Sequence, residues 1–294
     1  MLAGVQETIT DVAGKVGEAV VGVGRRRHVG SGIVIDDGIV LTNAHNIHNR
    51  QVTITFADGR RETGDVRGID TDGDIAVVAV DTGKVPPVGW GDSDVTLGSP
   101  VVGVSNPGGR GLRVTVGYVS GVDRSFRGPR GRRISGSIEH TAPLLPGSSG
   151  GPIVDESGKL LGINTNRLGE GFYLAISADE QLHTRVTKLA EGEAPRRRYL
   201  GVSVVPGFVA RKMRRAVGLP DANGVLVRDV AEDGAAAVAG ITEGDLIIRV
   251  GDHEVGEVDD LHDALNVVAF GEPFTVTVLR GADELELSAT IAEA

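Results

Sequence analysis

Short apolar stretches separated by glycine-containing turns run from residue 30 to residue 177 and restrict the folds open to this part of the chain. Stretches such as "DIAVVAV" and "LRVTVGYVSGVD" are rich in β-branched residues at strand spacing, and "DDG", "ADG" and "ESG" stand where hairpin turns are expected. The chain holds 44 glycines against six Phe, three Tyr and one Trp, which is typical of many turns around an aliphatic core. Helical patterns flank this region at residues 7–18 and 179–191 but do not interrupt it. We therefore predict a mostly β domain, built as a sandwich or as closed barrels.

From Tyr199 onward the chain changes in both pattern and charge. Residues 1–198 carry 23 Lys or Arg and 23 Asp or Glu, whereas residues 199–294 carry 7 and 17, so the formal charge of −10 lies entirely in the last third. Strand-like and helix-like segments alternate there, and the preceding "EGEAPRRR" is polar and contains a proline. We therefore predict a β domain over 1–190, a linker over 191–198 and an α+β domain over 199–294.

Charge, hydropathy and cysteine content argue against several classes of protein. The acidic last third is a poor partner for nucleic acid, and the arginine clusters elsewhere have few aromatic residues between them for base stacking. No apolar stretch approaches the roughly 20 residues of a membrane span, and no secretory signal is visible. We expect a cytoplasmic protein if the chain is full length, and a periplasmic or extracellular one if a leader or anchor was removed. The absence of cysteine excludes a thiol nucleophile, a disulfide framework and a zinc site built on cysteine.

Three segments supply the residue types needed for hydrolysis by a serine nucleophile, namely a hydroxyl, a general base and an acid that orients the base. In "GSSGG" two serines, Ser148 and Ser149, lie among glycines that let backbone N–H groups point at one spot. His45 follows the apolar stretch "IVLTNA", where a rigid strand end would hold it. Asp74 precedes the apolar stretch "IAVVAV", so its carboxylate is expected to be partly buried.

The order of His45, Asp74 and the serine pair is that of chymotrypsin-like folds, whereas in α/β-hydrolases the serine comes first. "GSSGG" also fits the G-x-S-x-G turn of those hydrolases, but that turn leads into a helix and the following "PIVD" is strand-like. Asp70 and Asp72 are competing acids, and Asp74 is preferred because it directly abuts an apolar strand. A metal pair formed by His45 and His48 is disfavoured, since no glutamate follows His45 as H-E-x-x-H requires.

Several motifs, in family order, resemble those of the HtrA/Deg family of serine proteases. The first domain is similar through "VLTNAH" at 40–45, "DIAVVAV" at 74–80, "PGSSGGPIVD" at 146–155 and "LLGINT" at 160–165. The last third resembles the PDZ domain appended to those proteases, through "YLGV" at 199–202 and the segment around "AGITEGDLI". The resemblance implies a chymotrypsin-like double β-barrel with a short N-terminal helix outside it, followed by an α+β PDZ domain.

The resemblance also implies roles for individual residues. Ser149 would be the nucleophile, His45 the general base and Asp74 the acid. The backbone of three residues would form the oxyanion hole, namely Gly147, Ser148 and Ser149. Three residues would border the substrate pocket, namely Leu144, Asn164 and Thr165. Four residues would form the loop that binds a peptide carboxylate, namely Tyr199, Leu200, Gly201 and Val202.

The function implied is that of an ATP-independent endopeptidase that cleaves unfolded or misfolded polypeptides and needs no metal or other cofactor. Similar proteins commonly assemble as trimers through the protease domain, so a homotrimer is expected, and the PDZ domain would bind peptide C-termini. The acidic charge of this PDZ region further predicts a preference for tails with Lys or Arg upstream of the carboxylate. A chaperone or peptide-binding adaptor with a latent triad is the alternative function, and an esterase is a third.

A few positions depart from the family pattern or lie outside the predicted site. Thr141 and Leu145 stand where the family usually has Asp and Asn, so the pocket is expected to differ. The arginine-rich segment at 123–133 falls where similar proteases carry a regulatory loop. His140 and His183 have no evident partners in the sequence, and we expect them to be structural or solvent-facing.

Overall fold

The computed structural model describes residues 2–25, 28–91, 95–128, 131–169, 171–193 and 198–292. The chain divides into two compact units, Met1–Pro195 and Arg196–Ala294. Each unit has its own hydrophobic core. Residues 194–197 of the predicted linker lie outside the described residues.

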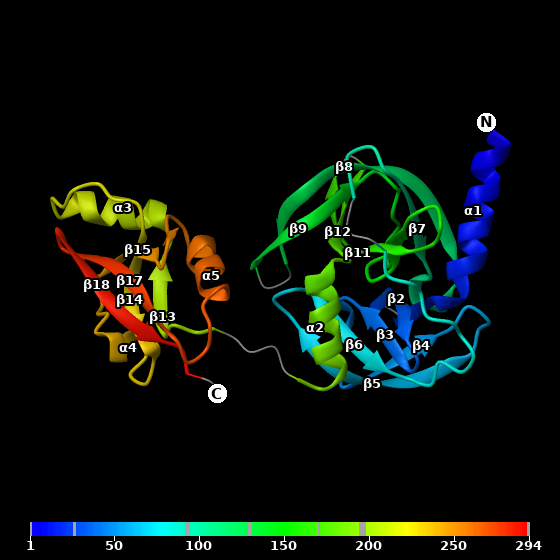
Figure 1. Ribbon diagram of the computed structural model, residues 1–294, viewed down its shortest axis with the longest axis horizontal. Coiled ribbons are helices and arrows are strands. Elements are labelled where there is room, and N and C mark those ends of the chain that lie inside the picture. The colour runs from blue at the N-terminus through cyan, green and yellow to red at the C-terminus, as the bar shows by residue number, and fades with distance from the viewer. Residues whose placement is uncertain are drawn as a thin grey trace. The chain divides into compact units, whose positions relative to one another are not determined.

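Two closed β-barrels make up most of the first unit (Figure 1). The first barrel contains, in spatial order, β1 (Val20–Arg25), β2 (His28–Asp36), β3 (Ile39–Thr42), β6 (Ile75–Ala79), β5 (Arg61–Asp70) and β4 (Gln51–Thr55). The second contains β10 (Pro152–Val154), β11 (Leu160–Gly169), β12 (Phe172–Ser177), β9 (Arg133–His140), β8 (Arg113–Arg127) and β7 (Pro100–Ser105). The prediction of a mostly β domain with closed barrels is confirmed.

Helix α2 (Glu180–Ala190) explains why some strands are apolar on both faces. It packs on β5 and β6, so the side chains of β6 that point out of the barrel are covered by the helix. Asp179 directly precedes the helix, and its carboxylate accepts the N–H of Leu182 over 2.8 Å and caps the first turn. Leu182, Val186 and Leu189 are buried along its inner face and join the core of the first unit.

Helix α1 (Leu2–Val16) begins before the predicted range of 7–18 and packs on β7 and β8. Its Val12 and Val16 belong to the core of the first unit. The shorter helical turns of this unit are η1 (Gly17–Ala19), η2 (Ala44–Asn46) and η3 (Pro107–Gly109). No helix among the described residues is both long and apolar enough to cross a membrane.

The second unit is an antiparallel sheet with helices, as the predicted α+β pattern required (Figure 1). Its strands are β13 (Val202–Val205), β14 (Val225–Val230), β15 (Leu246–Val250), β16 (His253–Glu254), β17 (Pro273–Arg280) and β18 (Asp283–Thr290). Its helices are α3 (Gly207–Ala216), α4 (Ala235–Ala239) and α5 (Val258–Asn266). The order β13-β14-β15-β17-β18 places β13 at an edge of the sheet.

Candidate functional site

The two serines lie in a tight loop at 145–151, the serine loop, which precedes β10. The N–H of Ser148 donates to the carbonyl of Leu145 over 3.0 Å and closes a β-turn in which Gly147 has a φ of +88°. A proline followed by a glycine of positive φ at the two central positions defines a type II turn. Gly150 has a φ of +87°, and a Cβ on it would lie 2.1 Å from a backbone oxygen. The glycines of "GSSGG" are therefore required by backbone conformation and by close packing.

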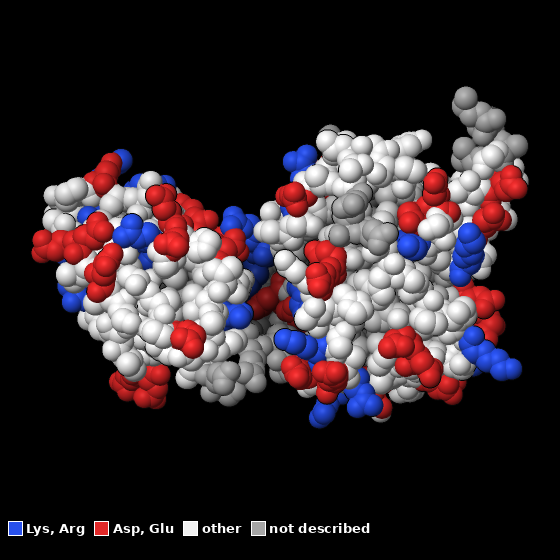
Figure 2. All heavy atoms as spheres, viewed as in Figure 1, with Lys and Arg blue, Asp and Glu red and all other residues white. Residues whose placement is uncertain are grey.

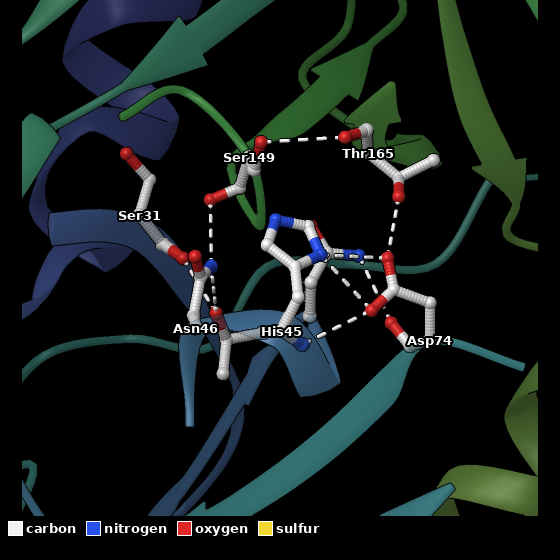
Figure 3. A network of polar contacts seen from close by, with 8 residues as sticks. Ser31, His45, Asn46, Asp74, Ser149 and Thr165 are labelled. Carbon is white, nitrogen blue, oxygen red and sulfur yellow. Dashed lines mark hydrogen bonds and ion pairs between the residues drawn. The ribbon is translucent and has the colours of Figure 1, made fainter. Parts of the chain in front are cut away.

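His45 and Asp74 are in direct contact at one end of the first barrel (Figure 3). His45 lies in η2, just after β3, and Asp74 ends the acid turn, residues 70–74, just before β6. Nδ1 of His45 lies 3.0 Å from Oδ1 and 2.9 Å from Oδ2 of Asp74. The Asp74 side chain is 1% exposed and that of His45 is 32% exposed. Because a carboxylate only accepts hydrogen bonds, it holds the imidazole proton on Nδ1 and leaves Nε2 free to act as a base.

Other residues fix the orientation of the Asp74 carboxylate. The backbone N–H of His45 donates to Oδ1 over 3.1 Å, and the hydroxyl of Thr165 donates to Oδ2 over 2.6 Å. The amide of Asn43 donates to the carbonyl of Asp74 over 3.0 Å. Asp74 has a φ of +55°, a left-handed conformation that aspartate tolerates better than most residues. Thr165, which the sequence placed only at the pocket, therefore supports Asp74 through its side chain.

Ser149 lies beside His45, but its hydroxyl is turned elsewhere (Figure 3). Ser149 Oγ donates to the carbonyl of Thr165 over 3.3 Å. Among the described residues, no hydrogen bond joins this hydroxyl to His45. The carbonyl of Ser149 is held more firmly, since it accepts from the N–H of Ser31 over 2.8 Å and from the amide of Asn46 over 3.0 Å. No motif or spacing in the sequence pointed to Ser31 or Asn46.

The backbone N–H groups of the serine loop differ in whether they are already bonded. Within the described part of the chain, no backbone or side-chain acceptor is found for the N–H of Gly147 or of Ser149. The N–H of Ser148 is occupied by the carbonyl of Leu145. The loop therefore offers two available N–H donors, one on each side of Ser148. From the sequence, the N–H groups of all three residues were predicted to form the oxyanion hole.

The remaining predicted pocket residues lie close to the serine loop. Asn164 is fully buried, and its backbone N–H and carbonyl bond to Gly151 and Gly150 over 2.9 and 2.8 Å. Its side-chain oxygen faces Nε2 of His140 at 2.9 Å, so the side chain braces the interior. Leu144 is half-buried, and a Cβ added to Gly103 would lie 3.6 Å from it.

His140 and His183 both have partners, which sequence reasoning did not find. His140 is fully buried and stacks on Tyr173 with 5.8 Å between ring centroids. Burial lowers the pKa of the His140 imidazole from 6.5 to about 4, and the hydrogen bond to Asn164 opposes this only in part. His183 packs edge-on against Trp90 at 4.7 Å.

The competing acids Asp70 and Asp72 bond to arginines and to the acid turn itself. Asp70 accepts from the N–H groups of Asp72 and Gly73 and faces Arg185 of α2 at 3.3 Å. Asp72 faces Arg132 at 3.4 Å. Arg132 belongs to the segment 123–133 predicted as a regulatory loop, of which residues 129 and 130 lie outside the described residues.

In the second unit, the predicted carboxylate-binding loop at 199–202 leads into the edge strand β13 and includes its first residue, Val202. The carbonyls of Leu200 and Gly201 accept from the N–H groups of Ala236 and Ala231 over 2.7 and 2.8 Å. Gly201 has a φ of +88°, and a Cβ there would lie 2.8 Å from the Cα of Gly234. Acidic side chains are spread over the visible face of this unit (Figure 2). The loop carbonyls are therefore turned into the domain, next to a free strand edge.

The two units match two known domain families in sequence. Residues 30–163 match the trypsin-like peptidase domain, and residues 199–291 match the PDZ domain. The chain belongs to the HtrA/Deg family of serine proteases, in which a trypsin-like peptidase domain is followed by a PDZ domain.

Individual relatives agree with this assignment. The chain is 34% identical to the putative serine protease HhoB of Synechocystis, over 87% of this chain and 64% of that protein. It is 33% identical to the putative serine protease HhoA of the same organism, over 90% of this chain and 70% of that protein. A probable periplasmic serine endoprotease, DegP-like, of Halomonas elongata is 30% identical over 91% of this chain and 57% of its own length. The chain thus spans less than two thirds of the length of two of these three relatives.

Solved structures show the same fold over nearly the whole chain. The HtrA-type protease AlgW with a decapeptide superposes with a TM-score of 0.80 at 25% identity, covering 97% of this chain and 98% of that one. A serine endoprotease from Yersinia pestis superposes with a TM-score of 0.75 at 28% identity, covering 97% and 98%.

Proposed function

We propose that the protein is an ATP-independent serine endopeptidase that cleaves unfolded or misfolded polypeptides through an acyl-enzyme. Family membership supports the reaction class. The observation that carries the residue assignment is the contact between His45 and buried Asp74, with Ser149 beside it on a loop that has two available N–H donors.

In the proposed mechanism Ser149 Oγ attacks the scissile carbonyl while His45 Nε2 takes its proton. Asp74 holds the imidazole by Nδ1–H and stabilises the imidazolium that forms. The N–H groups of Gly147 and Ser149 donate to the developing oxyanion. His45 then gives the proton to the leaving amine, and water hydrolyses the acyl-enzyme by the same route. The bonded N–H of Ser148 is left out of this oxyanion hole.

We further propose that the PDZ domain binds the C-termini of polypeptides. An extended peptide can add to a free sheet edge, and β13 is such an edge. The inward carbonyls of Leu200 and Gly201 are consistent with a loop that presents its N–H groups to a carboxylate. The peptide-bound AlgW structure supports peptide binding in this family. Assembly as a homotrimer stays a prediction, which light scattering of the purified chain tests directly.

A second candidate is a chaperone or adaptor that is inactive at rest. The hydrogen bond of Ser149 Oγ to Thr165 rather than to His45 favours it, because a hydroxyl bonded elsewhere is not activated. In apo enzymes, however, catalytic hydrogen bonds often form only when substrate binds. The two candidates therefore differ in whether unfolded substrate is cut.

The deciding experiment compares the wild-type chain with Ser149→Ala on denatured casein. We expect cleavage by the wild type and none by the variant, with peptide binding retained in both. Binding without cleavage in the wild type would support the adaptor. Small-ester turnover without proteolysis would support an esterase instead, and unchanged proteolysis by Ser149→Ala would remove Ser149 from the mechanism.

A further inference from the structure

We propose that Asn46 is a positioning residue that holds the backbone of Ser149 at a fixed distance from the turn that carries His45. The inference rests on the proposed function, in which His45 takes the proton of Ser149. Asn46 directly follows His45 in η2, on the first barrel, while Ser149 belongs to the serine loop of the second. One side chain therefore links the segment of the base to that of the nucleophile.

The contacts of Asn46 use both hydrogens of its amide nitrogen. Nδ2 donates to the carbonyl of Ser149 over 3.0 Å and to the hydroxyl of Thr42 over 3.0 Å. The Thr42 hydroxyl in turn donates to the carbonyl of Ser31 over 2.7 Å, and the N–H of Ser31 donates to the carbonyl of Ser149 over 2.8 Å. These four bonds join β2, β3, η2 and the serine loop in a closed ring, and Figure 3 shows three of its members, Ser31, Asn46 and Ser149. Linked bonds of this kind polarise and strengthen one another.

The space around the Asn46 amide is shaped by glycines on both sides. A Cβ on Gly30 would lie 2.4 Å from its amide atoms, and one on Gly150 would lie 3.0 Å from Nδ2. Gly30 belongs to β2, and Gly150 belongs to the serine loop. The amide therefore occupies a slot that a larger side chain at either glycine would close.

The geometry explains why such a link matters for proton transfer. Ser149 Oγ now bonds to Thr165, so it must rotate about its side chain to reach His45. Rotation brings the two groups together only if the backbone of Ser149 is already at the right distance from η2. A displacement of about 1 Å between reacting groups can cost roughly 100-fold in rate. Holding the Ser149 carbonyl fixes that distance without restraining the hydroxyl.

The test uses three variants of the full chain. Asn46→Ala removes the amide, and Asn46→Asp keeps its shape but replaces the donor with an acceptor that faces the Ser149 carbonyl. Asn49→Ala is the matched control, because Asn49 is exposed in the same segment. The rate of phosphonylation by diisopropyl fluorophosphate measures the reactivity of the serine, and kcat and KM are measured on a casein-derived peptide. Thermal melts confirm that each variant is folded at the assay temperature.

We expect Asn46→Ala to lower the phosphonylation rate and kcat about 10-fold, which is the effect of losing one hydrogen bond that positions Ser149. KM should stay within about threefold of the wild type. Asn46→Asp should be slower than Asn46→Ala at pH 8. Its rate relative to wild type should rise toward pH 5, because a protonated carboxyl recovers a donor. Asn49→Ala should match the wild type.

Rates within twofold of wild type for both Asn46 variants would overturn the inference while leaving the role of Ser149 intact. Equal pH profiles for Asn46→Asp and wild type would also contradict it. If Asn46→Ala does not fold, the Asn46→Asp profile decides alone. A wild-type chain that does not react with the reagent would overturn the proposed function and, with it, this inference.

Discussion

The acid side and the serine side of the candidate site are held in different ways. Asp74 is almost fully buried and receives hydrogen bonds from His45 and Thr165 at 2.6 to 3.1 Å. Ser149 instead is fixed through its backbone carbonyl, and its hydroxyl makes one long bond of 3.3 Å. The proposed base is therefore already oriented by Asp74, whereas the hydroxyl of the proposed nucleophile does not point at the base.

In the proposed mechanism this difference means that the hydroxyl of Ser149 has to reorient, whereas His45 does not. A pre-oriented base costs no reorganisation during the reaction. In the proposed mechanism Ser149 Oγ must exchange its bond to the Thr165 carbonyl for one to His45, which a rotation of the side chain alone would accomplish. The comparison predicts the largest effect from a change to the Asp74 carboxylate itself and smaller, graded effects from changes to the residues that hold it or the serine loop.

The largest effect is expected from Asp74→Asn. An amide in place of the carboxylate can donate to Nδ1 and select the wrong tautomer of His45, so kcat should fall about 10⁴-fold with little change in KM. Steady-state kinetics on a fluorogenic peptide measure this. A loss of less than tenfold would show that Asp74 does not orient the base.

Gly150→Ala should damage the serine side by distorting its loop. The added Cβ would lie 2.1 Å from the backbone oxygen of Ser31. The alanine would also have to adopt the positive φ that Gly150 has. Strain and overpacking each cost roughly 1–3 kcal/mol, so unfolding free energy should fall by about 4 kcal/mol. Urea denaturation measures the change, with Gly59→Ala as a control that also has a positive φ but open space around it.

His140 should make the protein less stable as the pH falls. Its pKa is about 4 in the folded protein and 6.5 when exposed, so between these values the unfolded chain binds a proton that the folded chain does not. Stability should therefore decrease by about 3 kcal/mol from pH 7 to pH 4 because of this residue. The measurement compares urea denaturation of the wild type and His140→Gln across this range.

In His140→Gln this part of the decrease in unfolding free energy between pH 7 and pH 4 should disappear. His183→Gln should keep it, since His183 is exposed. Parallel pH curves for the wild type and His140→Gln would contradict the assignment.

The smallest effect is expected from Thr165→Val, which touches both sides of the site. It removes the hydroxyl that donates to Asp74 but keeps the carbonyl that accepts from Ser149. We expect kcat to fall about tenfold, the size of one charge-assisted hydrogen bond. A change in KM alone would instead place Thr165 only at the substrate pocket.

The sequence was sufficient for features that depend on strand spacing and local turns. The β-branched stretches and glycine turns predicted the barrels, and the positions of His45 after one strand and Asp74 before another predicted that the two would meet. The glycines around Ser149 were also informative, because their positive φ values and close contacts are local requirements.

The contacts that could not be predicted depend on which distant segments of the chain the barrels bring together. Asn46 and Ser31 meet Ser149 across more than 100 residues of chain, and ordinary polar residues beside strands carry no pattern that reveals this. His140 was interpreted without a partner because Asn164 lies on a different strand, two positions away in the sheet. The bonded N–H of Ser148 follows from the turn type, which the sequence suggested only in outline.

Labelling the active serine with a fluorophosphonate probe and mapping the adduct by mass spectrometry tests the central claim most directly. We predict a single adduct on Ser149 of the wild-type chain, absent from Ser149→Ala and strongly slowed in Asp74→Asn. An adduct on Ser148, or proteolysis without any adduct on the serine loop, would contradict the account.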